Sequence, residues 1–357
     1  MMGAKLMSQT GRLVTIAVCV ALGIGAGVTA VSQARLPAPA GTSPAVRLTD
    51  RELWQLSVDA SEPNGFFRSD NLTSNELGFE RVIPELLSRT RPGAAYLGVG
   101  PEQNFTYIAA VRPAIAIIFD IRRGNLQLQL MYKAIFELTK DRADFVSMLF
   151  SRPRPRGLTA ETPVADLFAA FSAATNDEAL YERNLAAITE RLLKVHALPL
   201  PSLDVEGIGH IYRVFFERGA AIRFSPNYAE LMSATDEAGV YRSYLASESN
   251  FTIVRDLETS NLIVPVVGDF AGPKAIRRIG AYLKAHGVPV SAFYLSNVEQ
   301  YLQDGKWAAF CRNVATLPLD ASSTFIRSTS GRGSTFGPGF VSSLGSMATE
   351  TRSCPAP

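Results

Sequence analysis

Short runs of apolar residues recur along the chain, and stretches with helical spacing lie between them. The apolar runs occupy residues 94–100, 114–121, 261–270 and 288–298. The stretch at 125–138 (NLQLQLMYKAIFEL) places apolar residues three and four positions apart, which predicts an amphipathic helix. Helices are also expected at 50–60 and 75–89. Uninterrupted apolar strands that alternate with helices are typical of a parallel sheet covered on both faces. The pattern therefore predicts an α/β fold with a doubly wound, mostly parallel sheet.

Two regions depart from this alternation. Residues 152–205 begin with the basic run RPRPR, which predicts an extended linker, and continue as an Ala- and Leu-rich helical insertion. The alternation of strands and helices is expected to resume with IYRVFFERG at 211–219. From Ala321 onward Ser, Thr, Gly and Pro dominate. We therefore expect one α/β domain over residues 50–320 and a weakly ordered Ser/Gly-rich tail over residues 321–357.

Residues 1–34 have the composition of a targeting segment. Lys5 and Arg12 precede an uncharged run over residues 13–34, which ends in the small-residue pattern SQA that a signal peptidase requires. The run is also long enough to span a bilayer, so an uncleaved membrane anchor is the alternative. A Pro- and Ala-rich linker follows over residues 35–49. We expect an exported protein, periplasmic or secreted, or one anchored to the inner membrane by residues 13–34.

Charge and composition exclude several classes of protein. The net charge is +2, and both excess positive charges lie in the first 34 residues, so the rest of the chain is neutral. A neutral body lacks the positive field with which proteins bind nucleic acid, so no nucleic-acid partner is expected. Apolar residues make up 47% of the chain, which excludes a fully disordered protein.

The chain contains three cysteines, and their positions suggest one disulfide bond. Cys19 lies in the apolar N-terminal run, and removing that run leaves Cys311 and Cys354, an even number. Cys354 stands in the Ser/Gly-rich tail, where an unpaired thiol would be exposed to oxidation. This favours a bridge between Cys311 and Cys354. The alternative is a buried, reduced Cys311 with an unpaired Cys354.

The strongest chemical signal is a glycine-containing turn after the first apolar run. Gly98 and Gly100 end this run, and Glu102 and Asn104 follow at the start of the next helix. Glycines let a ligand approach the backbone, and the N-terminus of a helix offers unpaired N–H groups. Asp120 ends the next strand, 20 residues after Gly100. A carboxylate in that position can accept hydrogen bonds from a ribose diol.

This arrangement resembles the class I S-adenosylmethionine-dependent methyltransferases over residues 94 to about 315. Gly98 and Gly100 match the first two glycines of the family's G-x-G-x-G turn, and Asp120 matches its ribose-binding acid. Glu102 replaces the third glycine, where it would intrude on the methionine end of the ligand or bind its ammonium group. The resemblance implies a Rossmann-type fold and makes S-adenosylmethionine the candidate cofactor. Its implied binding residues are Gly98, Gly100, Glu102, Asn104 and Asp120.

Polar residues also follow the later apolar runs. The candidate ligand pocket comprises Arg122, Asp269, Asn297 and Glu299. The carboxyl ends of parallel strands meet at one edge of a sheet, so Glu102, Asp120, Asp269 and Asn297 are expected to converge there. Two local explanations remain open. Asp120 pairs with a neighbouring arginine, or the strand ends are polar simply because they meet solvent.

Other catalytic patterns are missing, so whether the chain is an enzyme stays open. His196, His210 and His286 are too far apart for a local zinc pair, and no metal site is expected. Neither a P-loop nor a G-x-S-x-G elbow occurs. One hypothesis is a methyltransferase acting on a small molecule or an envelope component, since methyl transfer chiefly requires two positioned reactants. The other is a non-catalytic exported ligand-binding protein on a degenerate version of the fold. A hydrolase ranks last because no nucleophile motif is present.

Overall fold

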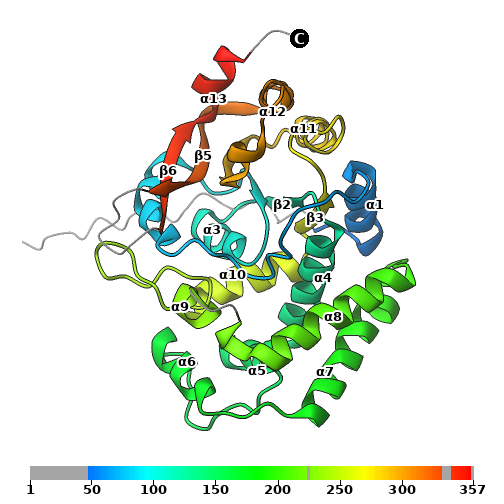
Figure 1. Cartoon of the computed structure of the whole chain (residues 1–357), viewed down its shortest axis with the longest axis vertical. Coiled ribbons are helices and arrows are strands. Elements are labelled where there is room, and N and C mark those ends of the chain that lie inside the picture. Colours follow the sequence, from blue (N-terminus) through cyan, green and yellow to red (C-terminus); the bar gives the residue numbers. More distant parts are fainter. Residues whose placement is uncertain (1–46, 223–225, 332–338, 355–357) are drawn as a thin grey trace, which may run out of the picture. The chain divides into compact units, whose positions relative to one another are not determined.

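The computed structural model describes residues 47–222, 226–331 and 339–354, all within the structural unit Pro44–Pro357 (Figure 1). The targeting segment expected at residues 1–34 and most of the following linker lie outside the described residues, so their roles stay predictions. Within these ranges, no helix combines the length and apolarity that a membrane crossing requires.

Six strands form one sheet in the order β3-β2-β1-β4-β5-β6. They are β1 (Ala95–Val99), β2 (Ile115–Asp120), β3 (Ile263–Val267), β4 (Val290–Ser296), β5 (Leu319–Gly331) and β6 (Gly339–Ser346). The first five strands run parallel, and β6 pairs antiparallel with β5. The α/β class and the mostly parallel sheet are thus confirmed.

Alternate residues of the strands pack into two separate hydrophobic cores. In β2, Ile115, Ile117 and Phe119 enter one core, whereas Ala116 and Ile118 enter the other. The first core is covered by α1 (Asp50–Ala60), α11 (Ala275–Ala285), α12 (Lys306–Val314) and α13 (Met347–Glu350). The second core is covered by α2 (Ile83–Arg89), α3 (Gln103–Val111) and α4 (Arg123–Leu138), with the remaining helices beyond them. Helices therefore cover both faces of the sheet (Figure 1), which explains the uninterrupted apolar strands.

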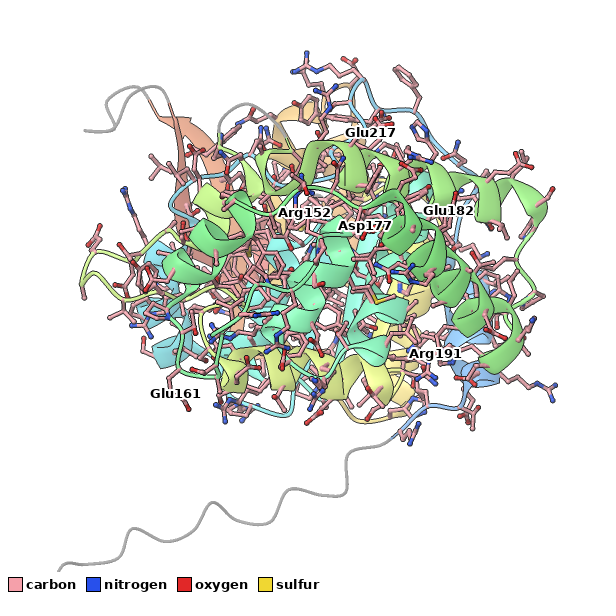
Figure 2. All side chains as sticks on the ribbon, turned by 90° about the horizontal axis from the view of Figure 1, so that it is seen from below. Arg152, Glu161, Asp177, Glu182, Arg191 and Glu217 are labelled. Atoms are coloured by element: carbon pink, nitrogen blue, oxygen red, sulfur yellow. A yellow bond between two sulfur atoms is a disulfide. The ribbon has the colours of Figure 1, made fainter. Side chains whose placement is uncertain are left out.

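The connection from β2 to β3 spans residues 121–262 and carries a large helical layer, seen from the side away from the sheet in Figure 2. After α4 its helices are α5 (Arg142–Phe150), α6 (Val164–Ser172), α7 (Glu178–Glu190), α8 (Ser202–Arg218), α9 (Tyr228–Met232) and α10 (Glu248–Thr259). The insertion thus extends beyond the expected residues 152–205. Residues 211–218, where strands were expected to resume, belong to α8. Ile211, Tyr212, Phe215 and Phe216 are buried there at helical spacing.

The basic run at residues 152–156 is tied to neighbouring helices and is not a free linker. Nη1 of Arg154 donates to both carboxylate oxygens of Asp141 at 2.8 Å and also binds Asp144. Arg152, which lies among the helices of the insertion in Figure 2, donates to the backbone oxygens of Phe150 and Ala174, each at 3.1 Å. Pro153 and Pro155 restrict the backbone of the run, while Arg152 and Arg154 donate to acceptors on the neighbouring helices and loops.

The segment from Ala321, expected to be a weakly ordered tail, instead completes the sheet. Most of β5, all of β6 and α13 come from it. Its polar residues are accommodated because buried hydroxyls find acceptors: Ser323 Oγ donates to the Val290 oxygen at 2.6 Å, and Ser328 Oγ donates to Glu76. Phe325 and Ile326 enter opposite cores. Residues 332–338 and 355–357 lie outside the described part.

A buried network of charges ties α1 and α4 to the helical insertion. On α4, the Glu137 carboxylate lies 2.7 Å from Lys133 Nζ, 2.7 Å from Arg191 Nε and 2.6 Å from His196 Nε2. The Nδ1 atom of His196 lies 2.7 Å from the Asp50 carboxylate. The hydrogen bond with Glu137, helped by the one with Asp50, raises the pKa of His196. Burial opposes ionisation of Glu137, but the hydrogen bond with His196 and the Lys133 charge lower its pKa to about 2.

We predict that the free energy of unfolding falls between pH 5.5 and pH 8. The contribution of His196 is fully present below its ordinary pKa and is lost as pH rises through its raised pKa. Burial raises the pKa of Glu80 and of Glu258 to about 8, so folding disfavours their ionisation over the same interval. The lowered pKa of Glu137 has the opposite effect on stability, but that effect changes only below about pH 4.5.

Thermal unfolding at the two pH values checks this, with a midpoint several degrees lower expected at pH 8. H196Q and E80Q should each flatten the dependence. A higher midpoint at pH 8 would contradict the assignment.

We predict that the disulfide between Cys311 and Cys354 stabilises the fold by about 3–4 kcal/mol. The bridge joins α12 to the chain end across a sequence separation of 43 residues, which restricts the unfolded chain. C354S should lower the free energy of unfolding by that amount, measured with urea. Reductant should do the same to the wild type and add nothing to C354S. Alkylation of both cysteines without reductant would disprove the bridge.

Candidate functional site

A cavity of about 290 Å³ lies at the carboxyl ends of β1, β2, β3 and β4. Its walls come from the loop at residues 66–76 and from the residues that follow each of these strands, up to the start of α12. The site residues expected from the sequence that line it are Gly100, Asp120, Arg122, Asp269 and Asn297. Gly98, Glu102, Asn104 and Glu299 are not among the lining residues.

The two glycines of the turn play different roles. Gly100 has φ +82°, a left-handed conformation that suits glycine, and its N–H donates to the Phe119 oxygen at 3.0 Å. Gly98 lies within β1, so the expectation that both occupy the turn is wrong for Gly98. A Cβ atom at Gly98 would overlap the Asn104 carboxamide and approach the Tyr96 hydroxyl. Gly98 is therefore required for packing, while Gly100 forms the cavity wall.

Glu102 and Asn104 face into the protein. The Glu102 carboxylate accepts the backbone N–H of Ser74 at 3.0 Å, and the residue is fully buried. Asn104 donates to the backbone oxygens of Val99 and Pro101 at 3.0 and 2.8 Å. Glu102 therefore does not converge with the other strand-end residues, because its carboxylate anchors the loop at residues 66–76.

Asp120 and Arg122 form a pair in the cavity wall. Oδ1 of Asp120 accepts both the backbone N–H and Nε of Arg122 at 2.9 Å, and Oδ2 lies 2.6 Å from Nη2. Nη1 of Arg122 donates to the backbone oxygens of Ser69, at 2.8 Å, and Asp70. The local pairing that the sequence left open is therefore present. It also ties the loop at residues 66–76 to the end of β2.

Asp269 lies after β3, on the opposite side of β2 from β1. Its Oδ1 accepts the N–H of Ala271 at 2.9 Å, which shapes the turn into α11. Its Oδ2 lies 3.9 Å from the Nζ of Lys306, which is largely exposed. The backbone N–H of Asp269 donates to Glu62 at 3.0 Å. Asp269 thus combines a structural hydrogen bond with a loose ion pair at the cavity edge.

The residues after β4 separate into cavity-lining and structural groups. Asn297 lines the cavity together with Ser296, which has φ +52°. A left-handed serine costs roughly 1–2 kcal/mol, so the surrounding contacts must hold it. Glu299 instead binds Arg327 at 2.6 Å, and Arg327 also binds Glu350. Glu299 thus connects β5 to the loop after β4.

Glu76 is the cavity residue that the sequence did not single out. Residues 75–89 were expected to be helical, but residues 75–78 form a loop and the Glu76 side chain lies in the cavity wall. The residue is only 2% exposed. Its carboxylate accepts hydrogen bonds from Tyr294 at 2.9 Å and Gln103 at 3.2 Å, and also from Ser296 and Ser328. The polar stretch SDNLTSNE at 69–76 was the available signal for an irregular loop.

The hydroxyl groups around Glu76 remain protonated donors. Burial, followed by the charge of Glu76, raises the pKa of Tyr294 and of Tyr107 well above the ordinary value. At the outer edge of the cavity, the rings of Phe67 and Tyr301 meet edge to face, with centroids 5.3 Å apart. Phe66 beside them is 86% exposed. Across the described ranges, no three His, Cys, Asp or Glu side chains are grouped to hold a metal ion.

The chain belongs to a family described as a domain of unknown function, DUF7790, whose model matches residues 72–347. The match covers the whole sheet and includes Glu76, Asp120, Asp269 and Asn297. None of the curated proteins compared with the chain matches it.

We predict that R122A destabilises the protein by about 3 kcal/mol, because it leaves the carboxylate of Asp120 without its cation in a site where both side chains are about one tenth exposed. The loop at residues 66–71 should also lose protection from hydrogen exchange. The matched control is R91A, which breaks the more exposed pair with Asp320 and should cost less than about 1 kcal/mol. Unchanged exchange in residues 66–71 would show that Arg122 does not hold the loop.

Proposed function

We propose that the chain is a methyltransferase-like protein that binds an adenosyl compound, with S-adenosylmethionine as the first ligand to test. The observation that carries the proposal is the position of the cavity at the carboxyl edge, beside β1, where the strand order reverses between β1 and β4. Open α/β sheets with helices on both faces bind ligands at such a point. Gly100 and Asp120 both line this cavity.

The charges in the cavity favour a neutral or cationic ligand over one with phosphate groups. Three lining residues are acidic (Glu76, Asp120 and Asp269) and two are basic (Arg122 and Lys306). Arg122 is already engaged by Asp120 and by backbone oxygens. The start of α3, where a phosphate would ordinarily bind, follows the buried carboxylate of Glu102. These features disfavour a pyrophosphate and suit a sulfonium compound.

The size of the cavity supports a single nucleoside. Its volume of about 290 Å³ lies at the lower end of small-molecule sites, which span roughly 300–1,000 Å³. A dinucleotide would extend beyond its walls. The exposed rings of Phe66 and Tyr301 offer apolar faces on which a base can stack at the mouth.

A non-catalytic ligand-binding protein is the alternative function. The observation that favours it is the pairing of both Asp120 oxygens with Arg122, which competes with a ribose diol. Gly98, Glu102 and Asn104 also do not line the cavity, so the resemblance to methyltransferases loses three of its five binding residues. Binding without methyl transfer would distinguish this alternative.

Location is part of the proposal. We propose that residues 1–34 direct the protein to export or anchor it to the inner membrane through residues 13–34. A domain held on the cytoplasmic side of the membrane would have access to S-adenosylmethionine, whereas an exported domain would favour the non-catalytic alternative.

We predict that S-adenosylmethionine raises the unfolding midpoint of the purified protein, because a ligand that binds only the folded state stabilises it. ATP and NAD contain the same adenosine but add phosphates, and they should have little effect. D120N should weaken binding about tenfold or more, measured by calorimetry, while D320N outside the cavity should not. No response to any adenosyl compound, or equal binding by D120N, would refute the proposal.

A further inference from the structure

The carboxylate of Glu76 is buried in the cavity wall and is held by neutral donors. Oε2 accepts three hydrogen bonds, from Tyr294, Gln103 and Ser328, whereas Oε1 accepts one, from Ser296. Of these four donors, Tyr294 and Ser296 themselves line the cavity. A carboxylate has about four lone-pair sites over its two oxygens, and Oε1 accepts only one hydrogen bond, so Oε1 retains acceptor capacity.

A relay of buried polar groups positions Glu76. Glu102 holds the N–H of Ser74, the hydroxyl of Ser74 binds Oε1 of Gln103, and Nε2 of Gln103 donates to Glu76 at 3.2 Å. The backbone N–H of Glu76 also donates to the Ser74 hydroxyl at 3.2 Å. The relay links the start of α3 to the loop at residues 73–76. Glu102 is therefore a positioning residue, which explains a buried acid in the glycine turn.

Glu76 differs from the other two acidic residues of the cavity because no basic side chain in the described residues forms an ion pair with it. Asp120 is paired with Arg122, and Asp269 lies 3.9 Å from Lys306. For Glu76, no ion pair occurs anywhere in the described parts of the chain. A positive group that approaches a buried carboxylate interacts with it strongly, because burial has already removed most of the surrounding water.

We propose that Glu76 receives a positively charged group of the ligand, such as an ammonium or sulfonium group. The inference rests on the proposed function only for the adenosyl part of that ligand. Because β1 lies between β2 and β4, Glu76 beside the end of β4 and Asp120 at the end of β2 flank opposite sides of the turn at Gly100. The ligand class is therefore a molecule that carries a cation at one end and hydrogen-bonding groups at the other.

The test compares charged and neutral probes on the full-length wild type, E76Q and E76D by calorimetry. The adenosyl probes are S-adenosylmethionine and its neutral relative 5′-methylthioadenosine. Agmatine and 1,5-pentanediol form a second pair without adenosine. E80Q is the matched control, because Glu80 is equally buried but does not line the cavity. E76D keeps the charge and withdraws it by one methylene, so it serves if E76Q does not fold.

The wild type should bind each cationic probe roughly tenfold or more tightly than its neutral partner. E76Q and E76D should reduce this preference, and E80Q should leave it intact. Equal affinity for cationic and neutral probes, or equal weakening of both by E76Q, would overturn the role of Glu76 while leaving the adenosyl proposal standing. Glu76-dependent binding of agmatine without any adenosyl binding would support the inference and refute the proposed function. Binding of none of the four probes would refute both.

Discussion

A parallel sheet that is apolar on both faces constrains everything else in this protein. Each of the first four strands is followed by a crossover that packs on one of the faces, so the five parallel strands end at the same edge. Within β1, β2, β3 and β4 no charged side chain lies on a face of the sheet, and Asp120 stands where β2 ends. The cavity forms at that edge, where Asp120 ends β2, and Arg122 and Asp269 closely follow β2 and β3. Its other charged residues, Glu76 and Lys306, come from the loop at residues 66–76 and from the start of α12. Packing of the sheet thus determines where chemistry can take place.

The wall of the cavity opposite the strand ends is built by a segment without regular secondary structure. Residues 64–78 cross the carboxyl edge, held by Arg122, by the Ile121 oxygen and by Glu102. All of these attachments are hydrogen bonds, several of them to charged groups, which are stronger than neutral ones. The loop therefore depends on buried carboxylates and a guanidinium where a helix or strand would depend on apolar packing. Glu76 and its relay belong to the same polar layer.

The sequence predicted β1, β2, β3 and β4 because each is a continuous apolar run. It also placed Asp120, Asp269 and Asn297 correctly at strand ends, since their positions follow from topology alone. Side-chain direction could not be predicted in the same way. Glu102 turns inward because it binds Ser74, 28 residues earlier, and local spacing carries no information about that contact.

Other features escaped prediction because tertiary contacts override local composition. The Ser- and Thr-rich β5 forms a strand because β4 and β6 satisfy its backbone on both sides and its buried hydroxyls find acceptors. The apolar and aromatic residues at 211–216 are compatible with either a strand or a helix. Only their burial at helical spacing shows that they belong to α8. The predicted targeting segment over residues 1–34 remains a prediction from sequence.

The order of the strands has a consequence for how the chain folds. β1 pairs with β2 after a short connection, but its other neighbour is β4, with Ala95 opposite Val290. The central strand therefore keeps one open edge until a partner almost 200 residues later has been synthesised. Bringing these two strands together costs the conformational entropy of a long loop before their contacts form, which slows folding. Until then the unpaired apolar strand is prone to aggregation. The large helical layer between β2 and β3 consists of local contacts that form quickly, and it can shelter one face of the half-built sheet during that interval.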